Sequence, residues 1–147
     1  MTGSDFRSLG EGIYASPQID LADVAAAKDL GVALIINNRP EGESPDQVAG
    51  PEIEAAARAA GIDYLAIPVT HAGFSEPQVQ AMAEALERAT GPVLAYCRSG
   101  TRSTLLWALA RAAQGGSPDD LAMAAARAGY DLGPIRGLLD MLAARSA

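Results

Sequence analysis

The sequence predicts an α/β fold in which a mostly parallel central sheet of about four to five strands is flanked by helices. Short apolar runs rich in β-branched residues alternate with helical segments along the chain. This alternation requires right-handed crossovers onto a parallel sheet with helices on both faces. The 147 residues have the size of one ordinary domain, so we expect a single domain over residues 1–147.

The first half of the chain contains alternating strands and helices with clear end signals. In chain order we expect a strand at 13–15, a helix up to residue 28, a strand at 32–36, a surface loop at 41–50, a helix from 51 and a strand at 64–69. Asp20 can cap the first helix, which closes at Gly31. Pro51 opens the second helix, which stops at Gly61.

The second half follows the same alternation and then becomes helical. In chain order we expect a helix at 76–90, a buried strand at 93–96, and helices at 104–113, from 117 to 129, and at 134–144. Ser75 and Gln78 form a capping-box pattern before the first of these helices. Ligands of parallel sheets gather at the carboxyl ends of the strands, which places the expected site after these strands.

Composition excludes several classes of function. The net charge of −7 argues against broad nucleic-acid binding, which depends on Lys and Arg contacts to phosphates. No apolar segment is long enough to span a bilayer and no leader pattern is visible, so we expect no membrane partner and a cytoplasmic location. One Cys and one His are too few for a common zinc site, so we expect a free thiol, no metal and no cofactor.

The segment at residues 97–103, Cys-Arg-Ser-Gly-Thr-Arg-Ser, lies directly between a buried strand and a helix. A turn of this kind leaves backbone N–H groups unpaired and makes a nest for an anion at the helix N-terminus. Gly100 allows the backbone to curl tightly, and the same field stabilises a thiolate at Cys97. The sequence therefore predicts a nucleophilic cysteine in an anion-binding loop, rather than a structural core cysteine.

The other residues of this loop have expected roles around the nucleophile. Arg102 can grip two oxygens of a tetrahedral oxyanion through its planar fork. Ser103 can donate a hydrogen bond to the sulfur as it leaves the intermediate. We therefore predict Cys97 and Arg102 as catalytic residues, and as substrate-binding residues the rest of the loop: Arg98, Ser99, Gly100, Thr101 and Ser103.

Four segments together resemble the beta-lactamase-hydrolase-like family with a phosphatase-like domain: residues 14–18 (YASPQ), 35–41 (IINNRPE), 67–69 (IPV) and 95–103 (AYCRSGTRS). The resemblance runs from about Asp5 to about Leu109. It implies the fold of a tyrosine or dual-specificity phosphatase. In that comparison Cys97 matches the nucleophile and Arg102 the arginine of the phosphate-binding loop.

The sequence departs from cysteine phosphatases in two ways. Those enzymes usually place five residues between nucleophile and arginine, whereas four separate Cys97 from Arg102, as in the loops of rhodanese sulfurtransferases. They also use an Asp as general acid, and residues 70–76 contain none. His71 or Glu76 can carry the proton instead, although His71 is equally well explained as an ordinary loop residue.

A second candidate for the pocket is Arg39. With Glu41, Glu43 and Asp46 it belongs to a charged loop of the kind that is usually solvated. However, Arg39 follows a strand whose carboxyl end shares an edge with Cys97, so it can border the pocket. Arg127, Tyr130 and Arg136 can line a cleft or lie on the surface, because nothing in their spacing decides between the two.

Three functions remain open, of which we favour a cysteine-dependent phosphatase that works through a cysteinyl-phosphate. The alternative is a persulfide-forming sulfurtransferase, which needs no general acid. A non-catalytic module that binds phosphorylated or sulfated partners is a third class. The expected partner is accordingly a phosphorylated or sulfane-sulfur-bearing substrate. Since members of the family that the chain resembles are fused or linked to sulfide-oxidising enzymes, the resemblance also implies such an enzyme as a partner.

Overall fold

The computed structural model describes residues 4–10, 12–70 and 72–146. The strands are β1 (Arg7–Gly10), β2 (Ile13–Ser16), β3 (Leu34–Asn37), β4 (Asp63–Ala66) and β5 (Val93–Tyr96). The helices are α1 (Leu21–Asp29), α2 (Gly50–Ala59), α3 (Glu76–Arg88), α4 (Thr101–Ala113), α5 (Pro118–Arg127) and α6 (Arg136–Ser146), with a 3₁₀ turn at Gly133–Ile135. The predicted α/β fold with a mostly parallel sheet is confirmed.

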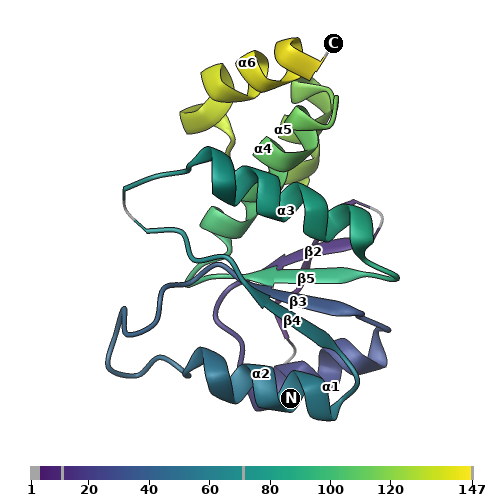
Figure 1. Cartoon of the computed structure of the whole chain (residues 1–147), viewed down its shortest axis with the longest axis vertical. Helices are drawn as coiled ribbons and strands as arrows, with labels where there is room; N and C mark the ends of the chain where they lie inside the picture. The colour runs from purple at the N-terminus through teal and green to yellow at the C-terminus, as the bar shows by residue number, and fades with distance from the viewer. Residues whose placement is uncertain (1–3, 11, 71, 147) are drawn as a thin grey trace.

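The sheet has the order β1-β2-β5-β3-β4, and only β1 runs antiparallel to its neighbour. Figure 1 shows α1 and α2 covering one face and α3 to α6 the other. Each face has its own apolar cluster, and β5 contributes side chains to both. All four residues of β5 are buried, which explains why its sequence is continuously apolar.

The register aligns the ends of the three central strands. Ser16 of β2 and Asn37 of β3 both pair with Tyr96 of β5. Cys97, the next residue, donates its main-chain N–H to the Ser16 carbonyl at 3.3 Å. The carboxyl ends of the parallel strands therefore meet around Cys97, at the edge where ligands of such sheets bind.

Several predicted boundaries are wrong by a few residues, and one strand was not predicted. β1 has Leu9 as its single buried residue, so it lacks the apolar signal of a strand. The strand predicted at 64–69 spans Asp63–Ala66, although the N–H groups of Ile67 and Val69 still donate to the carbonyls of Asn37 and Asn38 at 2.9 Å. The helix predicted from residue 104 begins at Thr101, which places Arg102 in the first turn of α4.

Candidate active site

The loop from Cys97 to Gly100 wraps the sulfur with main-chain groups. Gly100 has φ +90°, a left-handed conformation that favours glycine, and its N–H donates to Cys97 Sγ at 3.1 Å. The cysteine itself is fully buried and free of any disulfide. The N-terminus of α4 begins immediately after Gly100, so its partial positive charge lies beside the sulfur.

Carbonyl groups of the loop accept hydrogen bonds from residues outside the loop. The Arg98 carbonyl accepts from Gln18 N at 3.2 Å, and the Gly100 carbonyl from the main chain and hydroxyl of Thr104 at 3.0 and 2.8 Å. Within residues 4–10, 12–70 and 72–146, no acceptor takes a hydrogen bond from the main-chain N–H groups of four loop residues: Arg98, Ser99, Arg102 and Ser103. Free N–H groups beside carbonyls that are already bonded are the arrangement expected of an anion-binding nest, so the predicted binding of an anion by this loop stays a prediction.

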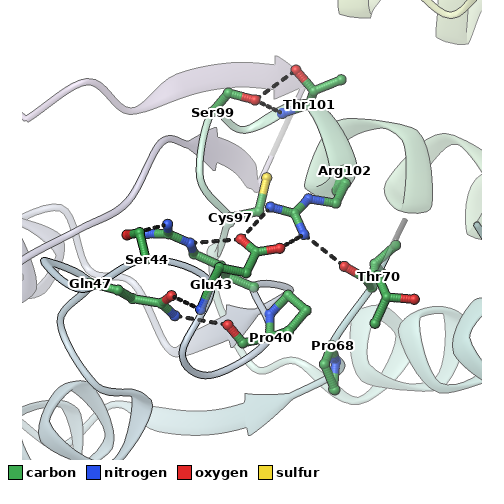
Figure 2. Close-up of polar contacts among 12 residues, drawn as sticks. Pro40, Glu43, Ser44, Gln47, Pro68, Thr70, Cys97, Ser99, Thr101 and Arg102 are labelled. Atoms are coloured by element: carbon green, nitrogen blue, oxygen red, sulfur yellow. Dashed lines mark hydrogen bonds and ion pairs between the residues drawn. The ribbon is translucent and has the colours of Figure 1, made fainter. Parts of the chain in front are cut away.

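The Arg102 guanidinium is held by two fixed acceptors. Its Nη1 donates to Glu43 Oε2 at 2.6 Å and to the Val69 carbonyl at 2.8 Å, and its Nη2 donates to Glu43 Oε1 at 2.9 Å. Figure 2 shows the guanidinium between the Glu43 carboxylate and the Cys97 sulfur. These bonds leave the Nε–H and the second Nη2–H, which form one edge of the planar fork, for another oxyanion.

The sequence indicates that Glu43 belongs to a solvated charged loop, and this expectation is wrong. Its side chain is only 16% exposed and also accepts from Arg39 Nε at 2.9 Å. The hydrogen bond from Arg102, followed by that from Arg39, lowers the pKa of Glu43 to about 2. Glu43 is therefore a carboxylate at neutral pH and holds Arg102, but it cannot serve as a proton donor there.

Arg39 lies behind Glu43. It is 4% exposed, and besides Glu43 it donates to Gln18 Oε1 at 3.0 Å and to Ser44 Oγ at 3.1 Å. Its guanidinium thus fastens the loop between β3 and α2 to the segment after β2. From this position Arg39 can act on Arg102 through Glu43. It does not border the pocket directly, because Glu43 lies between the two arginines.

The remaining predicted residues occupy different places. Ser103 is fully buried and donates to Asn38 Oδ1 at 2.8 Å, so in this geometry its hydrogen points to Asn38. Arg98, Ser99 and Thr101 are exposed at the rim, where the Ser99 and Thr101 hydroxyls contact each other at 3.0 Å. His71 lies outside the described residues. Glu76 pairs with Arg145 of α6 at 3.2 Å, on the side of α3 that faces α6.

The Arg102–Glu43–Arg39 cluster predicts a pH dependence of folding stability. Because the pKa of Glu43 is about 2 in the folded state and ordinarily 4.5, its stabilisation is complete above about pH 4.5 and lost towards pH 2. We expect the free energy of unfolding to fall by roughly 2 kcal/mol from this group between pH 5 and pH 2.5. Urea unfolding at both pH values measures it.

The matched control is Glu54, which forms an exposed ion pair with Arg58 at 3.0 Å on α2. Glu43→Gln should flatten the pH dependence, whereas Glu54→Gln should leave it unchanged, because exposed pairs contribute little. An equal pH dependence in Glu43→Gln and the unmutated protein would contradict the assignment.

The central parallel sheet and the cysteine–arginine loop at its carboxyl edge define a phosphatase-like α/β domain. The model of the family "Beta-lactamase hydrolase-like protein, phosphatase-like domain" matches residues 5–114, and the chain belongs to this family. Among the helices that the structure describes, none has both the length and the apolar character needed to cross a bilayer.

The relatives agree with this assignment. The chain is 36% identical over 107 residues to the beta-lactamase hydrolase-like protein of Agrobacterium fabrum, covering 73% of this chain and 25% of that protein. It is 40% identical over 104 residues to the corresponding protein of Xylella fastidiosa, covering 70% and 24%. The aligned part of the chain thus spans about a quarter of the length of these relatives.

Solved structures share the architecture. A candidate phosphatase from Neisseria meningitidis superposes with a TM-score of 0.83 at 35% identity, covering 95% of this chain and 99% of that one. The core catalytic domain of a PP-IP phosphatase from S. cerevisiae superposes with a TM-score of 0.71 at 17% identity, covering 96% and 86%. The latter likeness concerns the fold alone.

Proposed function

We propose that this domain is a cysteine-dependent phosphatase in which Cys97 is the nucleophile and Arg102 binds the transferring phosphoryl group. The observation that carries the proposal is the fixed Arg102 fork beside the sulfur, with one N–H edge left over. A phosphoryl group presents oxygens that match this edge and the main-chain N–H groups of the loop.

The reaction follows from this arrangement in two displacements. The Cys97 thiolate attacks phosphorus, the S–P bond forms, and the P–O bond to the leaving group breaks with its electron pair on oxygen. Water then attacks phosphorus, releases inorganic phosphate and restores the thiolate. Arg102 and the loop N–H groups stabilise the charge on the equatorial oxygens in both steps.

Local charge supports an anionic substrate in a protein whose net charge is −7. Arg39 and Arg102 carry two positive charges around the single carboxylate of Glu43. Arg98 adds another at the exposed rim of the loop. The site is therefore locally positive, which favours a phosphate dianion despite the acidic surface.

A second candidate function is persulfide-forming sulfur transfer, favoured by the four residues that separate Cys97 from Arg102. In this reaction the Cys97 thiolate attacks the sulfane sulfur of a donor such as thiosulfate, the S–S bond forms and sulfite leaves with the electron pair of the broken bond. An acceptor thiolate then attacks the outer sulfur of the persulfide and releases the Cys97 thiolate. For this candidate function the proposed partner is a sulfide-oxidising enzyme, as the family resemblance implies.

One side-by-side assay separates the two functions. The purified protein is given an aryl phosphate, whose good leaving group reduces the need for a general acid, and separately thiosulfate with cyanide. The proposal expects phosphate release that depends on Cys97 and no thiocyanate above the background of Cys97→Ser. Cys97-dependent thiocyanate without phosphate release would overturn it in favour of sulfur transfer.

A further inference from the structure

Tyr130, in the part of the chain that follows the residues matched by the family model, contacts the active-site loop. This residue follows α5, lies outside the matched residues 5–114, and is 7% exposed. Its hydroxyl donates to the Ser99 carbonyl at 3.1 Å. Burial raises the pKa of Tyr130, so its hydroxyl keeps the donated proton at neutral pH.

The Ser99 carbonyl belongs to the same peptide group as the Gly100 N–H. That peptide is trans, so the carbonyl and the N–H point in opposite directions. On one side the carbonyl accepts from Tyr130, and on the other the N–H donates to Cys97 Sγ at 3.1 Å. Holding the carbonyl outward therefore holds the N–H toward the sulfur.

This orientation is not fixed by the backbone itself, because glycine is the residue that most readily permits the peptide before it to rotate. The neighbouring carbonyls of Arg98 and Gly100 are fixed by Gln18 N and Thr104. Among the described residues, Tyr130 is the one donor to the Ser99 carbonyl.

The tyrosine is itself held closely against the loop. A Cβ added to Gly100 would meet the Tyr130 hydroxyl oxygen, so the two are in direct contact. The Arg7 guanidinium lies 5.1 Å from the centre of the Tyr130 ring and donates to the Ala128 carbonyl at 3.3 Å. The tyrosine is thus held by Gly100 at its hydroxyl end and by Arg7 over its ring.

We propose that Tyr130 is a positioning residue, whose hydroxyl fixes the Ser99–Gly100 peptide with its N–H toward Cys97 and the bound oxyanion. Its effect on turnover rests on the proposed function, whereas its effect on the reactivity of the sulfur does not. A hydrogen bond to the carbonyl also polarises the peptide and strengthens its N–H as a donor.

The test is Tyr130→Phe, which keeps the ring and every formal charge. The titratable groups that face Cys97 are Arg102, held by Glu43, and Tyr130 beneath Arg7. The rate of Cys97 alkylation by iodoacetamide is measured from pH 5 to pH 9. We expect the alkylation rate at the acidic end of this range to fall about three- to tenfold, because the sulfur loses part of the hydrogen bond that favours its thiolate form. With an aryl phosphate, we expect kcat to fall about tenfold and KM to change little.

Tyr14→Phe is the matched control, because Tyr14 lies on β2 with its ring 6.5 Å from that of Phe6 and away from the loop. It should leave the alkylation profile unchanged, and thermal unfolding of both variants should show that they are folded. An unchanged profile in folded Tyr130→Phe overturns the proposal. If the profile shifts while no variant releases phosphate, the positioning role stands and the phosphatase function falls.

Discussion

Replacing Cys97 by serine should abolish aryl phosphate turnover, with a loss of at least about 10³-fold in kcat. The sulfur is the one group that receives the Gly100 N–H at the N-terminus of α4. A serine hydroxyl at neutral pH carries almost no negative charge, and this site places no general base beside it among the described residues. Release of inorganic phosphate at saturating substrate measures the loss.

The variant should retain the fold and the nest. Serine is close to cysteine in size, and the carbonyl contacts of Gln18, Thr104 and Tyr130 do not involve the sulfur. Far-UV circular dichroism and binding of inorganic phosphate, followed by calorimetry, serve as controls. Turnover near that of the unmutated protein would remove Cys97 from the mechanism under both enzymatic hypotheses.

The parts of the fold that the sequence predicts well are those with local signals. β5 is apolar throughout because both of its faces are covered, and Asp20 caps α1 through Asp23 N at 2.9 Å as its type and position predict. Gln78 accepts from Ser75 N at 2.8 Å, as the capping-box pattern predicts. β1 is different, because a short edge strand depends on its neighbour β2 rather than on its own composition.

The candidate site likewise has a part with a local sequence signal and a part without one. The loop from Cys97 to Arg102 is contiguous, so its residue types and spacing predict a nest at a helix N-terminus. Glu43 meets Arg102 across 59 positions of sequence, and Tyr130 meets Ser99 across 31. No periodicity connects such pairs, so only the register of the sheet and the return of the chain after α5 bring them together.

For Arg39 the sequence predicts the position in the fold but not the role of the side chain. The topology argument puts it at the edge of the sheet that carries Cys97, and it lies there. Yet its bonds to Glu43, Gln18 and Ser44 make it a support for the carboxylate that holds Arg102. Sequence alone gives the edge of a strand, whereas the direction of a long side chain depends on partners supplied by other loops.

Arg102→Lys should lower kcat for an aryl phosphate by about 10³-fold while leaving the protein folded. Lysine keeps the positive charge that Glu43 requires, so the partly buried carboxylate is not left unpaired. An ammonium group cannot, however, bind Glu43 and the Val69 carbonyl and still present a planar pair of N–H groups to the phosphoryl oxygens. Initial rates and urea unfolding at neutral pH measure both effects.

Introducing Glu43→Gln into the unmutated protein and into Arg102→Lys then shows whether the Glu43 carboxylate acts through Arg102. In the unmutated protein this change should lower kcat about tenfold, because the Arg102 fork loses its fixed acceptor. In Arg102→Lys it should cost much less, since the planar edge that Glu43 orients is already absent. Equal losses in both backgrounds would show that Glu43 acts independently of Arg102, and full activity in Arg102→Lys would exclude a bidentate grip on the transferring group.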